Sequence, residues 1–364
     1  VPWKGMCRLC DSNQGHHQKN IMENLNKKIV TLIPSATEIV SFLGEKNSII
    51  GCSHECDYPL GLEKIDKLTS PKINVDGTSN EINKQINSLL ENSLSVYKVN
   101  VQKLKKLNPD YIVTQAHCEV CAVSFSEVED IVEKYLNKRT KIISLQPNTL
   151  KEVFDDFDRV AEELDIYNSK NRNLINLLKK RVDQIKNLSF YKKPKVACVE
   201  WIDPLMVAGN WIPELVSISG GDDIFGNIGK NSHWIKFEEI KKSDPDIIIF
   251  MPCGFDINKT NEELKIFFKK NPIWKSLKSF KDENFFVVDG NQFFNRPGPR
   301  LIDSIEILLE IIHPSLTDLN YKNKGWIKFD NKNWFIIFHN SVYIFFQIHM
   351  DTFHFFVFFY LLVY

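Results

Sequence analysis

The feature that most constrains this chain is a repeated alternation of short apolar segments with longer amphipathic ones. The apolar segments are rich in β-branched and aromatic residues, as buried parallel strands are. They occupy residues 29–33, 49–52, 111–114, 141–144, 195–200, 247–250 and 285–288. Because amphipathic segments of helical length separate them, the chain is predicted to form parallel sheets covered by helices, which is an α/β fold.

Two helix starts are predicted from the spacing of capping-box residues. Ser35 to Glu38 (S-A-T-E) follows the first strand, and Thr149 to Glu152 (T-L-K-E) follows the fourth. In such a box the hydroxyl accepts a hydrogen bond from the helix, and the glutamate reaches back to the backbone. The second start opens a helical connector over residues 149–193, which is long enough to join two lobes as a stiff bridge.

A weak internal repeat supports two related lobes. Residues 97–115 and 234–251 are each predicted to form a helix, a turn of sequence N-P-D or D-P-D, and a strand. Both copies continue into a loop that holds a cysteine, Cys118 in one and Cys253 in the other. One copy of such a pattern is common in α/β folds, but two copies, one in each half, are typical of a pair of lobes.

The chain is therefore divided into lobes and flanking segments. The lobes are residues 27–148 and 194–314, on either side of the connector at 149–193. Residues 1–26 are polar, contain no apolar run of signal-peptide length, and are expected to be a disordered or mispredicted extension. Residues 315–364 form an aromatic-rich tail.

Three interpretations of the tail stay open: a membrane anchor, a segment that packs on the body, and a mispredicted gene end. Its last stretch is nearly long enough to span a bilayer. His349, Asp351 and His354 are costly in hydrocarbon, however, and favour the other two. The lack of a recognisable signal and the free-looking cysteines favour a cytoplasmic location, with a periplasmic or membrane-tethered one as the alternative.

The charge balance excludes one class of function. Lys and Arg together number 46, as do Asp and Glu, so the chain lacks the basic excess of a nucleic-acid binder. The sequence also lacks a nucleophile elbow, a P-loop and a dinucleotide-binding motif, so we expect a binding protein and not an enzyme.

Aromatic, polar and sulfur-containing side chains collect where the predicted strands end. In open parallel sheets, ligands bind beyond the carboxyl ends of the strands. The pattern indicates a binding cleft for a small molecule between the lobes. Its candidate ligand-binding residues are Pro34, Ser35, Ala36, Thr37, His54, Glu55, Tyr58, Gln115, Trp201, Asn210, Trp211, Phe255, Asn291, Phe294, Asn295 and Arg296.

A second hypothesis concerns metal. His54 and Cys56 follow one strand, and Cys118 and Cys121 follow another, so the four could meet at one sheet edge. Imidazole and thiolate suit zinc, copper(I) or an iron–sulfur cluster. The alternatives are coordination of the metal in a bound cofactor, a Cys118–Cys121 disulfide, and free thiols near the cleft. Cys52, inside a strand, is expected to be a core residue.

Two arginines flank a turn near the end of the last predicted strand. Arg296 and Arg300 enclose Pro297-Gly298-Pro299, and Pro297 suits the first turn of a helix. Arg296 at that helix start could pair with an anionic group of a ligand, such as phosphate or propionate. The alternative is that it ties two loops together.

The motifs around these residues resemble a known family. P-S-A-T-E after the first strand, D-Y-P in the second loop, N-P-D, A-G-N-W and G-N-Q-F-F-N-R-P-G-P-R are similar to those of periplasmic cobalamin-binding proteins and their iron-siderophore relatives. The resemblance covers about residues 27–314. H-E-C-D-Y-P, C-E-V-C-A-V-S and F-N-R-P-G-P-R look like the loop sequences of a subgroup.

The resemblance implies a class III solute-binding, chelatase-like fold of two Rossmann-like lobes with central parallel sheets joined by a rigid helical connector. It implies a monomer that binds a corrinoid (cobalamin), haem or iron chelate in the cleft, without a required cofactor, and that can deliver the ligand to an ABC transporter permease. The alternative is a metal-binding or enzymatic protein that uses His54, Cys56, Cys118 and Cys121.

Overall fold

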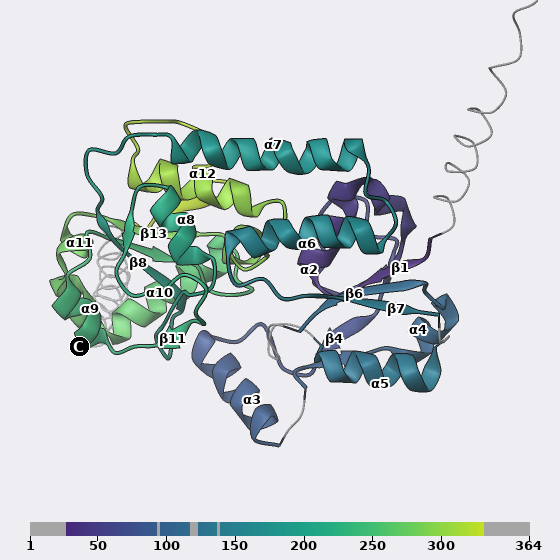
Figure 1. Ribbon diagram of the computed structural model, residues 1–364. Helices are drawn as coiled ribbons and strands as arrows, with labels where there is room; N and C mark the ends of the chain where they lie inside the picture. Colours follow the sequence, from purple (N-terminus) through teal and green to yellow (C-terminus); the bar gives the residue numbers. More distant parts are fainter. Residues whose placement is uncertain (1–26, 93–94, 117–122, 137–138, 331–364) are drawn as a thin grey trace, which may run out of the picture.

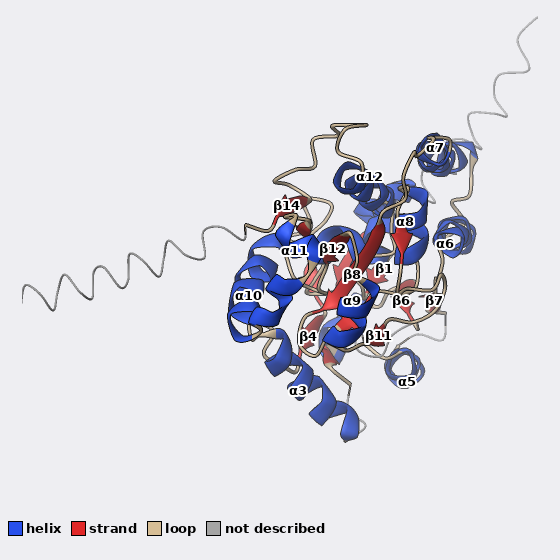
Figure 2. Ribbon diagram, turned by 90° about the vertical axis from the view of Figure 1, so that its left-hand side faces the viewer, coloured by secondary structure: helices blue, strands red, loops and turns tan. Residues whose placement is uncertain are grey.

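The computed structural model describes most of the chain, namely residues 27–92, 95–116, 123–136 and 139–330. Its strands form two main sheets, one from each half of the chain (Figures 1 and 2). We call residues 27–148 the first half and residues 194–330 the second half. No helix within the described ranges is both long and apolar enough to cross a bilayer.

The sheet of the first half is entirely parallel, with strand order β3-β2-β1-β6-β7. Its strands are β1 (Ile29–Thr31), β2 (Ile49–Cys52), β3 (Asp66–Lys67), β6 (Tyr111–Gln115) and β7 (Lys141–Leu145). A separate antiparallel pair is formed by β4 (Thr69–Pro71) and β5 (Tyr97–Val99). Residues 97–99 are thus a strand, where the internal repeat predicted the start of a helix.

The sheet of the second half has a parallel centre with short strands added around it. The central strands are β8 (Lys195–Trp201), β12 (Ile247–Phe250) and β13 (Phe285–Val288). The added strands are β9 (Met206–Val207), β10 (Asp222–Asp223), β11 (His233–Trp234) and β14 (Trp326–Lys328). Because β14 pairs with β13, this sheet includes residues that the sequence places in the tail. His349, Asp351 and His354 lie outside the described residues.

Helices cover these sheets in the positions that the alternating pattern predicts (Figure 2). The helices of the first half are α2 (Pro34–Val40), α3 (Ser79–Glu91), α4 (Val101–Leu107) and α5 (Phe125–Tyr135). Those of the second half are α8 (Ile212–Ile218), α9 (Phe237–Ser243), α10 (Ile257–Lys270), α11 (Lys278–Lys281) and α12 (Leu301–Ile312). Short π or 3-10 turns are η1 (Ser41–Glu45), η2 (Lys46–Ser48), η3 (Pro272–Ser276) and η4 (Gly290–Phe294).

The connector consists of α6 (Leu150–Glu163) and α7 (Ser169–Lys186), which lie along one side of the molecule and reach from one sheet to the other (Figure 1). The capping box predicted at the start of α6 is present: Thr149 accepts from the backbone N–H of Glu152, and the Glu152 side chain accepts in return. Asn168 caps α7 by accepting from the N–H of Asn171.

The capping box predicted at Ser35 is wrong. The helix α2 begins at Pro34, and the residue before it, Ile33, offers no side-chain cap. Proline suits the first helical position because its φ is already helical and it has no N–H to satisfy. The helix therefore starts two residues earlier than the predicted box requires, and Ser35 lies inside its first turn, from where its hydroxyl cannot cap it.

One large apolar core runs through both halves. It contains Ile29 and Val40 of the first half, Phe157 of α6, and Val196 and Leu308 of the second half, all almost fully buried. The helices α6, α7, α8 and α12 enclose this core on the connector side. The two sheets are therefore joined by packed side chains as well as by the connecting chain.

Candidate functional site

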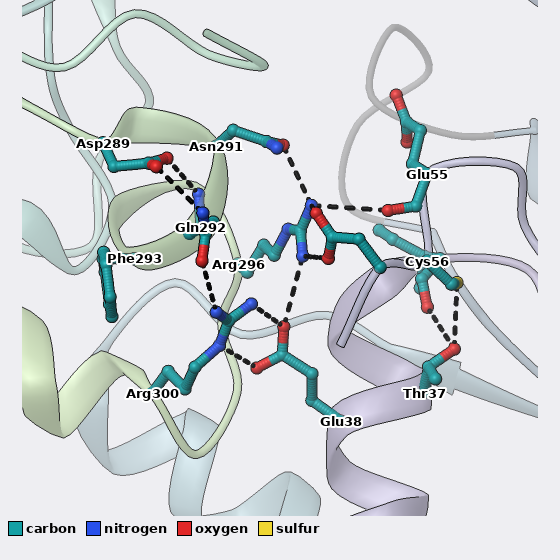
Figure 3. Close-up of polar contacts among 12 residues, drawn as sticks. Thr37, Glu38, Glu55, Cys56, Asp289, Asn291, Gln292, Phe293, Arg296 and Arg300 are labelled. Carbon is teal, nitrogen blue, oxygen red and sulfur yellow. Dashed lines mark hydrogen bonds and ion pairs between the residues drawn. The ribbon is translucent and has the colours of Figure 1, made fainter. Parts of the chain in front are cut away.

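Polar side chains from the two halves meet in a buried network at the start of α2 (Figure 3). Glu38 of α2 accepts two hydrogen bonds from Arg300, from Nε at 3.0 Å and from Nη2 at 2.6 Å. Both side chains are buried, with 1% of Glu38 and 9% of Arg300 exposed. This bidentate pair joins the first half to the second, and the sequence analysis singled out neither residue as part of a site.

Arg296 extends the same network. Its Nη2 donates to Asp57 Oδ2 at 3.1 Å and to Asn291 Oδ1 at 3.0 Å, and its Nη1 lies 3.5 Å from Glu38 Oε1. Of the two interpretations of Arg296, the structure places this residue between loops of the two halves, with its guanidinium committed to protein carboxylates. Arg296 as the partner of an anionic ligand group stays a prediction.

A second layer of contacts holds the two arginines in place. Gln292 accepts from Arg300 Nη1 at 3.1 Å and donates to Asp289, which caps the start of η4. The guanidinium of Arg300 also lies over the ring of Tyr58, with 4.2 Å between the guanidinium carbon and the ring centroid. Tyr58, a predicted ligand contact, therefore packs on this ion-pair network.

The network has opposite effects on its two carboxyl groups. Burial raises the pKa of Glu38, although hydrogen bonds and charge from Arg300 and Arg296 oppose the rise. Burial also opposes the ionisation of Asp57, but the hydrogen bonds and charge of Arg296 prevail and lower the pKa of Asp57. Asp57 is therefore the carboxylate that ionises most readily here, and its side chain is 49% exposed.

Next to this network lies a group of polar and aromatic side chains of the first half. The Tyr97 hydroxyl donates to Glu55 Oε1 at 3.3 Å, and the rings of Tyr97 and His54 lie 5.6 Å apart. His54 Nδ1 forms a hydrogen bond with Thr69 Oγ1 at 2.7 Å. Burial raises the pKa of Glu55, while burial and then the charge of Lys67 lower the pKa of His54, so both groups are shifted toward their neutral forms.

The second half contributes a facing group. The Trp201 and Phe255 rings lie 5.4 Å apart and pack in a small apolar cluster with Ile82 of α3, beside the partly buried Cys253. Trp201 Nε1 donates to the backbone oxygen of Ser79 at 3.2 Å. The first turn of α3 is thus fixed to the second half, on the side away from α7 (Figure 1).

Carboxyl groups of both halves act on the Cys253 thiol. Burial, and then the charges of Glu200 and Glu55, raise the pKa of the Cys253 thiol to about 12. Glu200 is the last residue but one of β8, accepts a hydrogen bond from the Ser232 hydroxyl, and has its pKa raised by burial. We call Glu55, Tyr97, Trp201, Glu200 and Cys253 the interlobe cluster. Sequence analysis included only Glu55 and Trp201 among the site residues.

The P-S-A-T residues form the first turn of α2 and are buried or nearly so. Thr37 Oγ1 hydrogen-bonds Thr31 at 2.6 Å and lies 3.0 Å from Cys56 Sγ (Figure 3). The buried Ser35 hydroxyl has no hydrogen-bond partner among the described residues. Gln115, also predicted, is buried at the end of β6.

The remaining predicted residues are used for packing and loop structure. Trp211 and Phe294 belong to the main core, and Trp211 Nε1 donates to the backbone oxygen of Phe294 at 3.0 Å. Asn295 donates to the backbone oxygen of Met251 at 3.2 Å. Asn210 has a left-handed backbone with φ of 53°. Asn291 contacts Arg296 of the ion-pair network, and no contact described above joins Trp211, Phe294, Asn295 or Asn210 to the interlobe cluster.

The predicted metal site is only partly described. Cys118 and Cys121 lie outside the described residues. Among those described, no group of three or more His, Cys, Asp or Glu side chains is placed to hold a metal ion. His54 and Cys56 instead contact Thr69 and Thr37. A four-ligand site, and the metal-handling alternative that depends on it, stay predictions.

Comparisons with known proteins agree with this architecture. A family model described as periplasmic binding protein matches residues 29–291. The vitamin B12-binding protein of Vibrio vulnificus is 21% identical over 292 residues, which are 78% of this chain and 89% of that protein. The ABC transporter substrate-binding lipoprotein YvrC of Bacillus subtilis is 22% identical, over 79% of this chain and 80% of that protein.

Solved structures show the same fold. The crystal structure of Staphylococcus aureus IsdE with haem aligns with a TM-score of 0.59 at 17% identity, over 79% of this chain and 99% of that one. The vitamin B12-binding protein BtuF of Vibrio cholerae gives a TM-score of 0.57 at 16% identity, over 80% and 98%. The predicted fold, a class III solute-binding architecture, is confirmed.

One expectation is overturned. The cytoplasmic location favoured by the sequence is wrong, because the matching family and relatives are periplasmic or lipoprotein components of ABC importers. That expectation gave too much weight to the polar character of residues 1–26 and to the cysteines. With a family model covering most of its length and the same fold in solved relatives, the chain belongs to the periplasmic binding protein family.

Proposed function

We propose that this protein binds a planar metal chelate of the corrinoid or haem type between its two halves and presents it to an ABC transporter permease, without catalysing a reaction. The observation that carries the proposal is the interlobe cluster. It takes Glu55 and Tyr97 from the first half and Trp201, Glu200 and Cys253 from the second, so a ligand placed there contacts both halves.

The chemistry of the cluster suits a large ligand with an apolar face and hydrogen-bonding edges. Tyr97 and Trp201 supply aromatic rings from the two halves, Trp201 packed on the buried Phe255, and aromatic rings pack well against a macrocycle. His54 has its pKa lowered, so its imidazole is biased toward the neutral form that ligates metals. Its Nδ1 is bonded to Thr69, which leaves Nε2 as the nitrogen to meet the metal of a bound chelate.

Charge favours a corrinoid over haem. The periphery of a corrinoid carries neutral amides, whereas haem carries propionate carboxylates. Burial raises the pKa of Glu55 and of Glu200, so both carboxyl groups can donate to an amide oxygen or accept from an amide N–H. A propionate would add a negative charge beside these two carboxyl groups and would oppose their ionisation further, and the guanidinium groups of Arg296 and Arg300, which could offset this charge, already contact Asp57 and Glu38.

The family and the printed names of its relatives support the same ligand class, since they include vitamin B12-binding and haem-binding proteins. They also support a permease as the partner. We propose that the protein acts as a monomer and that no catalytic group is required.

The test is an absorbance and calorimetric titration of the full chain with hydroxocobalamin, haemin and a ferric siderophore. We expect saturable binding of the corrinoid, weaker binding of haemin, and a melting temperature that rises with corrinoid concentration. No saturable signal and no thermal shift with any member of the panel would refute the proposal.

A further inference from the structure

The helix α3 belongs to the first half by sequence, but its apolar side packs on the second half. Isoleucines from residues 73–86 and side chains of the second half form one small cluster, whose members are Ile73, Ile82, Ile86, Trp201, Met206, Cys253 and Phe255. Among the described residues, the other apolar clusters contain no residue of α3. The helix is therefore an arm of the first half that is held by the second. We call residues 73–91, which are α3 and the segment before it, the clasp.

Three hydrogen bonds of Ser79 fix the start of α3 to the second half. Its N–H donates to Glu263 Oε1 at 2.8 Å, its backbone oxygen accepts from Trp201 Nε1 at 3.2 Å, and its hydroxyl accepts from the Asp203 N–H at 3.0 Å. Ser79 is the first residue of α3, where a helix leaves backbone N–H groups unpaired and has a partial positive charge. The carboxylate of Glu263, which is 8% exposed, satisfies one of these N–H groups from another helix.

Lys259 of α10 adds a contact to the segment before α3. Its ammonium group donates to the backbone oxygen of Val75 and lies 4.0 Å from the ring centroid of Phe255. The contacts of the clasp with the second half are thus a few hydrogen bonds and one small apolar cluster. On the opposite side of the molecule, the connector helices cover the large core that contains Phe157 and Leu308 (Figure 1). Movement between the halves therefore breaks fewer contacts at the clasp than at the connector.

The clasp also covers the aromatic side chains that the second half offers to a ligand. Trp201 is 8% exposed and Phe255 is 2% exposed. Ile82 of the clasp packs in the same cluster as both rings, and Ser79 accepts the hydrogen bond from the Trp201 indole. A macrocycle cannot stack on Trp201 while these two residues stay in place.

We propose that the clasp detaches from the second half as a unit and so admits a ligand to the interlobe cluster, while the core on the connector side stays packed. Release breaks the contacts of Ser79 with Glu263 and Trp201 and uncovers the Trp201 and Phe255 rings. Local openings of this kind have a lower free energy than global unfolding because they expose less apolar surface. The admission of a ligand rests on the proposed function, whereas the release of the clasp does not.

The first measurement is hydrogen exchange of the full chain without ligand, followed by mass spectrometry of peptides. We expect the amides of α3 to exchange much faster than those of β1 and β12. Glu263→Gln replaces a charged acceptor by a weaker neutral one of the same shape, and it is expected to speed exchange across α3 by about fivefold. The same variant should leave β1 and β12 unchanged. Glu262→Gln is the matched control, because Glu262 is exposed on α10 and pairs with Lys265.

The second measurement uses Cys253, which belongs to the cluster under the clasp. The native chain is labelled with N-ethylmaleimide for different times, quenched and digested with trypsin. Residues 243–259 form one tryptic peptide, and Cys253 is its only cysteine. The rate at which this peptide gains the label should rise in Glu263→Gln by about the factor seen for exchange, and Glu262→Gln should not change it.

The third measurement is the association rate of hydroxocobalamin in a stopped-flow instrument. This rate should rise in Glu263→Gln by the same factor as exchange of α3. Protection of α3 equal to that of β1 in the parent, or equal acceleration of all peptides in Glu263→Gln, would overturn the clasp. Faster exchange of α3 with an unchanged association rate would show that the clasp does not control entry. If hydroxocobalamin does not bind at all, the proposed function fails, and exchange and labelling still decide whether the clasp detaches.

Discussion

Glu38 and Arg300 lie 262 positions apart in the sequence, yet their side chains form two hydrogen bonds, of 3.0 and 2.6 Å, with almost no exposure to solvent. Two buried charges that satisfy one another cost little, but either one left alone is strongly unfavourable. The pair therefore makes the relative position of α2 and the 296–300 loop specific.

The first prediction concerns this pair. Glu38→Ala leaves the buried Arg300 guanidinium without its carboxylate partner. The substitution is expected to lower the free energy of unfolding by about 3–5 kcal/mol. Urea denaturation of the parent and variant measures the change. Lys151→Ala is the matched control, because it breaks an exposed ion pair with Asp155 that is worth about 0.5 kcal/mol or less. Equal effects of the two substitutions would contradict the structure.

The second prediction is a pH dependence caused by Asp57. Arg296 lowers the pKa of this carboxyl, so its stabilising effect is fully present above the unfolded value of about 3.8 and is lost as the pH falls through the lower folded value. Asp57→Asn should lower the free energy of unfolding at neutral pH. It should also reduce the loss of stability between about pH 4 and pH 2, which lies just below the ordinary pKa of an aspartate. Unfolding measured across this range checks both effects. A variant whose profile keeps the parent's slope would show that Asp57 is not the group responsible.

The third prediction concerns aromatic contact with the ligand. Trp201→Ala removes a ring of the interlobe cluster and is expected to weaken corrinoid binding by about 10-fold or more, as loss of a buried aromatic anchor does. Trp201→Phe should retain part of the affinity. Calorimetry gives the dissociation constants. Trp234→Ala is the control, since Trp234 is 56% exposed on the edge strand β11 and should leave affinity unchanged.

The fourth prediction separates ligands by charge. Burial raises the pKa of Glu200, and ionisation at higher pH adds a negative charge to the cluster. Glu200→Gln removes this titration, so it should strengthen haemin binding relative to corrinoid binding at high pH. The ratio of the two dissociation constants should then depend less on pH. Parallel titrations from about pH 4, near the ordinary Glu value, to about pH 9 provide the measurement.

Glu262→Gln, on the exposed face of α10, is the control for charge alone. An identical pH profile for parent and Glu200→Gln would remove Glu200 from the binding site.

The central strands were predictable because their hydrophobic periodicity is strong. Residues 247–250 and 285–288 form β12 and β13 with the predicted bounds, and the capping box at Thr149 starts α6. The added strands, such as β9 and β10, are two residues long and carry no periodic signal. Their pairing depends on the tertiary structure and could not be read from local pattern.

The candidate site was predictable only in part, for a similar reason. Strand ends identify which segments approach the site, and both Glu55 and Trp201 lie in such segments. They do not tell which groups pair over long sequence separations, as Glu38 does with Arg300, 262 positions away, and the Ser79 N–H does with Glu263, 184 positions away. Glu38 also fitted a local role, as the glutamate of a capping box, and that explanation concealed its pairing with Arg300. Tyr97 was missed because its segment was assigned to a helix.

The core that passes from Ile29 through Phe157 to Leu308 also determines how the molecule comes apart. Separating the halves would expose apolar surface on each of them, so neither half is expected to survive as an independent folding unit. Denaturation should follow a single cooperative transition, and the most slowly exchanging amide hydrogens of β1 and β12 should share one opening free energy.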